Sequence, residues 1–392
     1  MSRMKKTDRP YDIVLFGATG FVGRLIARYL ADHAPEQVRW AIAGRSEEKL
    51  QRLRETLPGG ARVGVLRADV ADPASLRALA GHARVVATTV GPYVLHGEEL
   101  VAACADLGTD YLDLTGEPEF VDLMYVRYDA RARETGARLL HACGFDSVPH
   151  DLGVYYTVRR LPEGVPLTVD GFVTADAAFS GGTFASALSQ FARGRQMVAA
   201  ARDRARHEPR LVGRRATAPV GAPRFAPEVD AWALPLPTID PQVVRRSAAA
   251  LRRYGPDFRY RHYAAVRRLP VALGGVAAVG ALAAAAQVPP VRRRLSDRLR
   301  PGDGPSAERR ARSWFSVRFV GEGGGRRVYT EVSGGDPGYD ETAKIFAEAA
   351  LSLALDPLPP ASGQVTTAVA MGDALTDRLV RAGIRFRVAA TR

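Results

Sequence analysis

Short apolar runs alternate with amphipathic stretches along the first 150 residues of the chain. The runs are typical of buried strands and lie at Asp12–Phe16, Arg39–Ala43, Ala61–Leu66, Val85–Val90, Tyr111–Leu114 and Arg138–His141. The intervals show the helical period at Phe21–Asp32, Glu47–Thr56, Pro73–Gly81, Gly97–Leu107 and Pro118–Thr135. Because parallel strands need crossover connections, this alternation predicts an α/β fold with a doubly wound parallel sheet.

The pattern changes in the second part of the chain. In chain order it predicts a strand at Leu167–Ala175, a helix at Phe184–Ala192, strands at Ser313–Val320 and Arg327–Val332, helices at Asp340–Leu355 and Gly372–Ala382, and a strand at Ile384–Val388. The glycine-rich segment Gly321–Gly325 makes the two middle strands a hairpin. From Gly194 to Arg268 the sequence is rich in proline and arginine and shows few clear periods.

Length and composition restrict the class of protein. A chain of 392 residues suggests two or three domains. Its 46% hydrophobic and 25% charged residues are a composition typical of globular proteins, which excludes a mainly disordered chain. Cys104 and Cys143 are the only cysteines and cannot form a disulfide framework or a four-cysteine zinc site, so no metal site is predicted. The N-terminal residues contain no apolar signal region, and we expect a cytosolic protein.

Positive charge is concentrated in the middle of the chain. The net charge is +13, and only 4 of the 55 basic residues are lysine, a bias typical of a GC-rich genome. Between Gln190 and Arg312 there are 25 arginines and 9 acidic residues. This segment suits an acidic partner, either an anionic lipid surface or an acidic carrier protein; a merely solvated surface is the alternative. Nucleic acid is not expected, because aromatic residues are 8% and no basic–aromatic stacking motif is present.

One uncharged segment, Leu269–Val291, stands between arginine clusters at Arg267-Arg268 and Arg292–Arg294. As a helix, its 18 residues Val271–Val288 would span about 27 Å, close to the thickness of a bilayer core. The segment is mostly Ala and Gly, so an interfacial segment, a buried helix and a membrane span all stay open. Basic clusters beside an apolar segment favour peripheral attachment at the cytoplasmic side of the plasma membrane.

The segment after the first strand contains a glycine-rich turn. Its residues are Gly17, Ala18, Thr19, Gly20, Phe21, Val22 and Gly23. A strand, a turn of this kind and a helix form the context of a dinucleotide-binding site, in which glycines allow close approach to a pyrophosphate and the helix N-terminus faces the phosphates. The motif therefore predicts a Rossmann-type nucleotide site; an ordinary glycine turn is the alternative.

The residues after the second and third strands bear on the choice of nucleotide. Arg45 and Ser46 stand where NAD-selective sites usually place an acidic residue, and a guanidinium can pair with a 2′-phosphate. We therefore expect NADP(H) as the cofactor. Asp69 ends the third strand and is a candidate for adenine contact, or else a turn residue or helix cap.

Further candidates follow the fourth and sixth strands. Ligands in open α/β sheets lie beyond the carboxyl ends of the strands, which places Val90, Gly91 and Pro92 beside the cofactor. Tyr93 and His96 come directly afterwards. The sixth strand leads into a polar loop that contains Cys143 and His150. There we expect His150 either to cap a helix or to pair with Asp151.

Longer segments carry a family resemblance. They are GATGFVG, AGRS, VGPYVLHGEELVAACADLGTDYLDLTGEPEF, ACGFDSVPHDLG, SGGTFASAL and AMGDALTDRLVRAGIRF. In this order they resemble the saccharopine dehydrogenase-like oxidoreductases, above all the trans-acting enoyl reductases, which work with polyketide synthases on cell-envelope glycolipids. The resemblance implies a Rossmann domain over 1–150, an α+β substrate domain with a mixed sheet over 151–335, and a return to the first domain over 336–392.

The leading hypothesis is NADPH-dependent reduction of an α,β-unsaturated acyl thioester in lipid or polyketide-lipid biosynthesis. Tyr93, His96 and Cys143 are candidate hydrogen-bond or proton donors; packing roles for Tyr93 and Cys143 are the alternative. Gly181, Gly182 and Thr183 could bind a phosphate or carboxylate at a helix start, or form an ordinary cap. An amino-acid oxidoreductase and a non-catalytic, membrane-associated NADPH-binding protein are the other functions considered.

Overall fold

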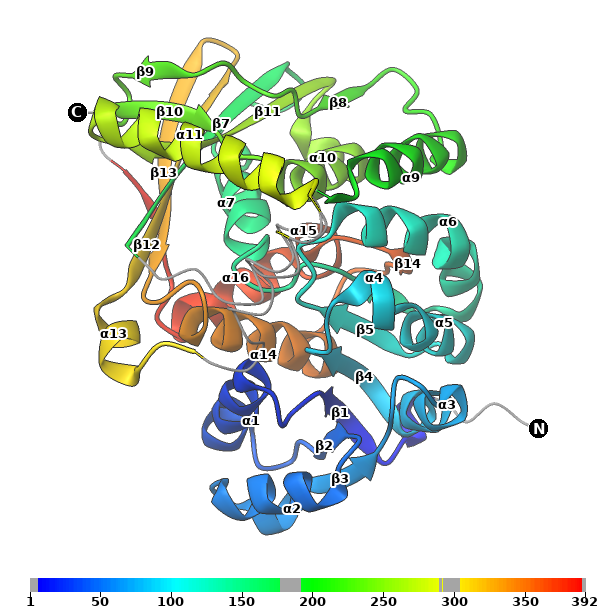
Figure 1. Cartoon of the computed structure of the whole chain (residues 1–392). Helices are drawn as coiled ribbons and strands as arrows, with labels where there is room; N and C mark the ends of the chain where they lie inside the picture. The colour runs from blue at the N-terminus through cyan, green and yellow to red at the C-terminus, as the bar shows by residue number, and fades with distance from the viewer. Residues whose placement is uncertain (1–5, 177–191, 289–290, 292–303, 390–392) are drawn as a thin grey trace. The chain divides into compact units, whose positions relative to one another are not determined.

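The computed structural model describes residues 6–176, 192–288, 291 and 304–389 (Figure 1). The chain forms two compact units, each built from several segments. The first comprises Met1–Gly144, Ala200–His207 and Tyr339–Arg378, and the second Phe145–Ala199, Glu208–Gly338 and Leu379–Arg392.

A seven-stranded parallel sheet forms the centre of the first unit, with the order β14-β6-β5-β4-β1-β2-β3. Its strands are β1 (Tyr11–Phe16), β2 (Trp40–Gly44), β3 (Gly64–Arg67), β4 (Ala83–Thr88), β5 (Asp110–Asp113), β6 (Arg138–Leu140) and β14 (Gly363–Gln364). This confirms the predicted doubly wound sheet. The seventh strand, β14, was not predicted, because two residues are too few to show a period.

The helices of the first unit cover this sheet. They are η1 (Lys6–Asp8), α1 (Phe21–His33), α2 (Glu47–Thr56), η2 (Gly60–Arg62), α3 (Pro73–His82), α4 (Tyr93–His96), α5 (Glu98–Leu107), α6 (Pro118–Thr135), α14 (Asp340–Leu355) and α15 (Thr367–Ala370). Helix α1 buries Gly23, Ile26, Ala27 and Leu30, the spacing of one helix face. Helix α14, from the C-terminal part of the chain, packs beside α1 and against β1 and β4.

The second unit contains an eight-stranded mixed sheet. Its order is β15-β13-β12-β7-β11-β10-β9, with β8 paired to β11. The strands are β7 (Leu167–Asp176), β8 (Arg215–Thr217), β9 (Arg224–Ala226), β10 (Ala231–Pro235), β11 (Asp257–Val266), β12 (Trp314–Gly323), β13 (Arg326–Gly334) and β15 (Arg385–Val388). Strand β11 runs parallel to β7 and β8, and the other pairs are antiparallel, which confirms the predicted mixed sheet.

The other elements are α7 (Val148–Val158), α9 (Gly194–His207), α10 (Asp240–Ala250), η3 (Arg252–Tyr254), α11 (Leu269–Ala286), α13 (Ala307–Arg312) and α16 (Gly372–Arg381). Helix α7 packs on β12 and β13 of the second unit. Gly153 permits this contact, because a Cβ there would stand 2.4 Å from the Phe319 ring.

The units divide the chain at points that differ from the expected domain boundaries. The N-terminal segment of the first unit ends at Gly144, and this unit also takes up Ala200–His207 from the middle of the chain. Strand β15 pairs with β13, so the last strand belongs to the second sheet. The segment 194–268, which has few clear helix or strand periods, contains α9, four strands and α10. Three of the strands, β8, β9 and β10, are too short to show the alternation of apolar and polar residues.

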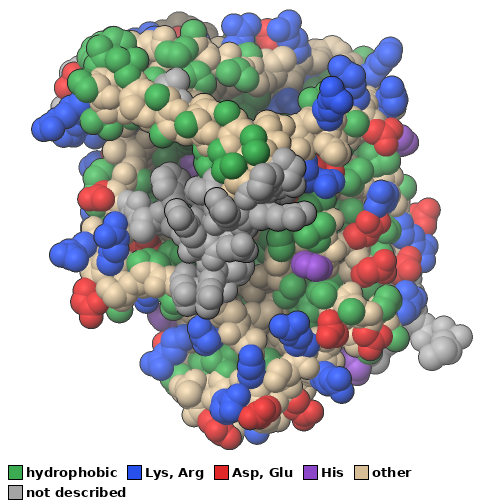
Figure 2. All heavy atoms as spheres, in the orientation of Figure 1, with side chains coloured by type: hydrophobic (Ala, Val, Ile, Leu, Met, Phe, Trp, Pro, Cys, Tyr) green, Lys and Arg blue, Asp and Glu red, His purple; other side chains and the backbone are tan. Residues whose placement is uncertain are grey.

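Most of the described side chains of helix α11 are exposed. Among the described residues it is the one helix long and apolar enough to cross a membrane. Leu269, Val271 and Leu273 are 40%, 59% and 63% exposed, and green apolar side chains follow the helix in Figure 2. Its described side chains contradict the expectation of a buried helix, whereas the interfacial and spanning interpretations stay predictions.

Candidate functional site

At Gly17 the turn after β1 lies close to the residues that follow β4. Gly17 has a φ of +87°, and a Cβ there would stand 2.6 Å from Thr89 Oγ1 and 2.7 Å from a methyl group of Val90. The Gly17 amide donates to the Ala43 carbonyl of β2 at 2.9 Å. Only glycine satisfies both the positive φ and the lack of space at this position.

Helix α1 starts against the same turn. A Cβ on Gly23 would lie 2.3 Å from the Gly17 carbonyl oxygen and 2.9 Å from Ala18 Cα, so the helix touches backbone here. Gly20 is the N-cap residue and provides no side-chain cap. The first N–H groups of a helix have no partner within the helix, and its positive dipole end attracts anions. The Gly17–Gly20 turn and the start of α1 therefore present backbone and a positive dipole end, which suit the charge of a pyrophosphate.

The turn lies where the strand order of the parallel sheet reverses. Strand β1 pairs with β2 on one side and with β4 on the other, and Phe16 is aligned with both Ala43 and Thr88. A dinucleotide binds across such a switch point. Thr89 Oγ1 donates to the Gly17 carbonyl at 3.1 Å and joins the β4 end to the turn, a role that sequence analysis missed.

The predicted flanking residues lie at the same edge of the sheet. Val90 borders the turn, and the exposed Gly91 and Pro92 follow it. Arg45 is exposed directly after the end of β2, and the Ser46 hydroxyl caps α2 by accepting from the Lys49 amide at 3.4 Å. An exposed guanidinium beyond β2 is free to meet the phosphate of an adenine ribose.

Asp69 serves a local turn. Its carboxylate accepts from the Ala71 amide at 3.0 Å, and its own amide donates to the Ser75 hydroxyl at 3.1 Å. These bonds match the turn alternative stated for this residue, and its contact with adenine stays a prediction.

Tyr93 has a buried hydroxyl with two backbone partners. It donates to the Thr88 carbonyl at 3.1 Å and accepts from the Leu114 amide at 3.2 Å, so it links the ends of β4 and β5. Burial raises the pKa of Tyr93, and the Asp113 charge raises it further. The phenolic proton is therefore directed to a backbone carbonyl.

The other two predicted donors lie in different environments. Cys143 is fully buried, and its thiol lies 3.8 Å from the His141 carbonyl. His96 is exposed at the end of α4. Their catalytic roles stay predictions, and Gly181, Gly182 and Thr183 lie outside the described residues.

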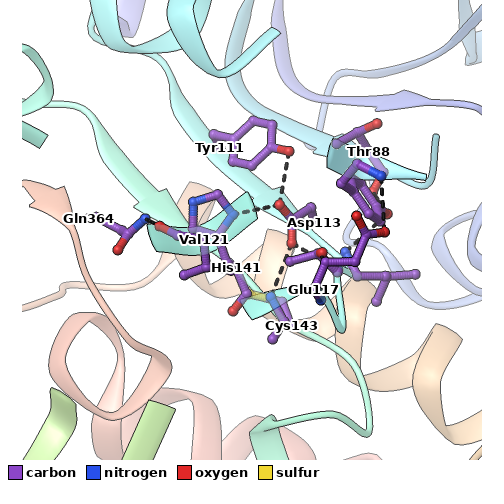
Figure 3. Close-up of polar contacts among 12 residues, drawn as sticks. Thr88, Tyr111, Asp113, Glu117, Val121, His141, Cys143 and Gln364 are labelled. Carbon is purple, nitrogen blue, oxygen red and sulfur yellow. Dashed lines mark hydrogen bonds and ion pairs between the residues drawn. The ribbon is translucent and has the colours of Figure 1, made fainter. Parts of the chain in front are cut away.

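A buried carboxylate holds the loops after β5 and β6 (Figure 3). Asp113 accepts from His141 Nδ1 at 2.6 Å, from the Tyr111 hydroxyl at 2.9 Å, and from the Thr115 and Ala142 amides at 3.0 Å. Four donors on one carboxylate fix the geometry of both loops at the carboxyl edge of the sheet.

Glu117 anchors the loop that contains Tyr93. Its two carboxylate oxygens accept from the Tyr93 amide at 3.1 Å and the Val94 amide at 2.9 Å, at the start of α4 (Figure 3). The pKa of Glu117 is raised overall, because burial outweighs the opposite effect of these two amide hydrogen bonds. Sequence analysis named neither Asp113 nor Glu117 as a site residue, although acidic residues at a strand end were a signal that could have found them.

Comparisons with known proteins identify an NADP-binding domain and a family of relatives. The model of the saccharopine dehydrogenase NADP binding domain matches residues 13–140. A relative from Mycobacterium tuberculosis with the provisional name trans-acting enoyl reductase is 40% identical over an alignment of 421 positions, covering 98% of this chain and 99% of the relative. The trans-acting enoyl reductase of Mycobacterium leprae is 36% identical and covers 97% of this chain and 98% of its own.

A solved structure has a related fold. Apo saccharopine dehydrogenase (L-Glu forming) from Saccharomyces cerevisiae superposes with a TM-score of 0.56 at 13% identity, covering 97% of this chain and all of that chain. At this identity the likeness concerns the fold.

Arg45→Asp is expected to weaken NADPH binding and to leave NADH binding unchanged or improved. Loss of a charge-assisted pair with the 2′-phosphate corresponds to about 1.5–3 kcal/mol, or roughly 10- to 150-fold in Kd. Fluorescence titration with both nucleotides measures the ratio of the NADPH and NADH dissociation constants. Arg52→Asp, with the same charge change on the outer face of α2, is the control. An unchanged NADPH to NADH ratio in Arg45→Asp would refute the assignment.

Proposed function

This chain belongs to the saccharopine dehydrogenase-like family of NADP-dependent oxidoreductases, and we propose that it is an enoyl reductase that acts in trans on α,β-unsaturated acyl thioesters. The observation that carries the proposal is the alignment over nearly the whole chain with relatives of that name, at 36–40% identity. Such coverage includes the second unit as well as the nucleotide domain, so the likeness extends beyond cofactor binding.

The nucleotide site fits NADPH. Neither Gly17 nor Gly23 has room for a Cβ, so the turn after β1, the start of α1 and the residues after β4 pack closely, as a dinucleotide-binding turn requires. Arg45 would hold the 2′-phosphate. Thr89 and Glu117 keep the adjoining loops in place through their backbone contacts.

When bound, NADPH supplies a hydride to the β-carbon of the unsaturated thioester. Negative charge then develops on the thioester oxygen, and the protein must offer hydrogen-bond donors there and a proton to the α-carbon. Of the three candidate donors, Tyr93 and Cys143 are buried and His96 is exposed. Tyr93 in its present bonds is a positioning residue for the ends of β4 and β5.

We propose that an acidic carrier protein presents the acyl substrate as its thioester. The support is the arginine-rich middle of the chain, where Arg215, Arg245 and Arg259 line a surface pocket of about 450 Å³ in the second unit. Phosphate and carboxylate groups of a carrier would complement these guanidinium groups, which raises the association rate at low salt.

The reaction is tested with NADPH deuterated at C4 and a long-chain 2-enoyl thioester. We expect NADPH oxidation and one deuterium at the β-carbon of the saturated product, located by mass spectrometry. The same acyl chain on an acidic carrier should give a lower KM than on a small thiol, and the difference should shrink at high salt.

Other results would contradict this proposal. Oxidation of NADPH only with 2-aminoadipate semialdehyde and glutamate would identify an amino-acid oxidoreductase. Saturable NADPH binding without turnover of any enoyl thioester would indicate a non-catalytic NADPH-binding protein.

We also propose peripheral contact of α11 with an anionic membrane surface, which would bring the enzyme to lipid substrates. The support is the exposed apolar helix with Arg267 and Arg268 immediately before it. Apolar burial and attraction to anionic lipid reinforce one another in such anchors.

Cosedimentation with vesicles measures this contact. The protein should bind phosphatidylglycerol-containing vesicles at low salt and bind pure phosphatidylcholine weakly. Replacing Val271 and Leu273 by Asp should reduce binding severalfold, because charges would enter the apolar face. The control replaces Val212 and Val220, 93% and 89% exposed outside α11, by Asp. Equal vesicle binding by the two double variants would exclude α11 as the anchor.

A further inference from the structure

Three ionisable side chains of the second unit meet in its interior. His150 lies in the first turn of α7, Asp240 begins α10, and His262 lies in β11. The side chains of all three are 1% exposed. Burial of a carboxylate and two imidazoles is unfavourable unless they bind one another or a shared ion.

The ligand atoms of these residues converge on one point. His150 Nδ1 lies 3.0 Å from Asp240 Oδ1, and His262 Nε2 lies 3.4 Å from Asp240 Oδ2. One ligand atom from each residue lies within 4.8 Å of those of the other two. Atoms that share a tetrahedral zinc ion at 2.0–2.1 Å stand about 3.4 Å apart, which is the scale of this cluster.

Several of these atoms lack a hydrogen bond. Among the described residues, both ring nitrogens of His150, Oδ1 of Asp240 and Nε2 of His262 are buried without a hydrogen-bond partner. His150 Nδ1 and Asp240 Oδ1 are close enough for one, but their orientation does not meet its angles. Buried polar atoms without partners are rare in folded proteins, so four of them in one cluster indicate a missing group that they would bind.

Neighbouring residues orient the cluster. The Tyr260 hydroxyl lies 2.8 Å from His262 Nδ1, and the Thr238 hydroxyl donates to Asp240 Oδ2. A proton on Nδ1, donated to Tyr260, leaves the Nε2 lone pair directed at the cluster. Outer partners of this kind fix the tautomer of metal-binding histidines.

We propose that His150, Asp240 and His262 bind one divalent transition-metal ion, with Zn²⁺ as the best match. Two imidazoles and a carboxylate form a donor set for zinc, whereas calcium and magnesium prefer oxygen ligands. The ion would join α7, α10 and β11 and so stabilise the second unit. This inference is independent of the enoyl reductase proposal.

No sequence motif points to this site. His150 was expected to pair with Asp151, but it faces Asp240, and Asp151 accepts a hydrogen bond from Ser247 instead. The three ligands are spread over 113 residues and form no short motif.

Metal titration of the full chain tests the proposal. The protein is stripped with a chelator and titrated separately with Zn²⁺ and Co²⁺, with metal content read by mass spectrometry. We expect one ion per chain, a visible Co²⁺ absorption band typical of tetrahedral N/O ligation, and a higher unfolding temperature with Zn²⁺. NADPH binding should persist without metal, because the nucleotide turn lies in the other unit.

The variants His262→Gln and Asp240→Asn should each weaken the Co²⁺ affinity at least tenfold and remove its absorption band. His207→Gln, an exposed histidine paired with Asp203, is the matched control and should bind as the wild type does. Absence of saturable binding in the wild type would overturn the site and leave a metal-free charge network. Binding that survives in both cluster variants would also overturn it, since the ion would lie elsewhere.

Discussion

Helix α1 reaches the turn after β1 because neither Gly17 nor Gly23 has a side chain. The 2.3 Å that would separate a Gly23 Cβ from the Gly17 carbonyl leaves no room for any other residue without displacement of the turn. This close packing places the N-terminus of α1, which has no side-chain cap, directly beside the turn. The β4 end completes the same edge, because Thr89 is bonded to Gly17. Cofactor binding, and therefore the proposed chemistry, depends on this contact.

Local patterns were enough to predict the part of the molecule built from short-range units. Each strand of the first sheet is followed by a helix or turn within 30 residues, and the period and the glycine spacing define these units, except at β14, which has only two residues. The sequence analysis therefore found β1, α1 and the turn, and it found the β12–β13 hairpin from the glycines between the two strands. It could not define 194–268, where β8, β9 and β10 have only three to five residues and where β8 and β10 pair with the more distant β11.

Contacts between distant residues account for what the sequence did not show. Asp113 lies 28 residues from His141, and Glu117 lies 24 residues from Tyr93, so neither pair forms a motif. The same holds for His150 and Asp240, which come together only after α7 and α10 pack. The residue types at the strand ends could be read from the sequence, whereas their hydrogen-bond and ion-pair partners are evident only in the folded chain. For Tyr93 the partner changes the interpretation, since its hydroxyl, considered as a donor for catalysis, donates a hydrogen bond to the Thr88 carbonyl.

The central claim is that bare backbone at the first turn binds the cofactor. Calorimetric titration of NADPH into the wild type and Gly23→Ala tests it most directly. The account predicts one saturable site per chain in the wild type and binding about tenfold or more weaker in Gly23→Ala, because the added methyl displaces the turn. Gly194→Ala, where a Cβ meets no atom within 4 Å, should bind like the wild type. No saturable heat in the wild type, or equal affinity in Gly23→Ala, would contradict the account.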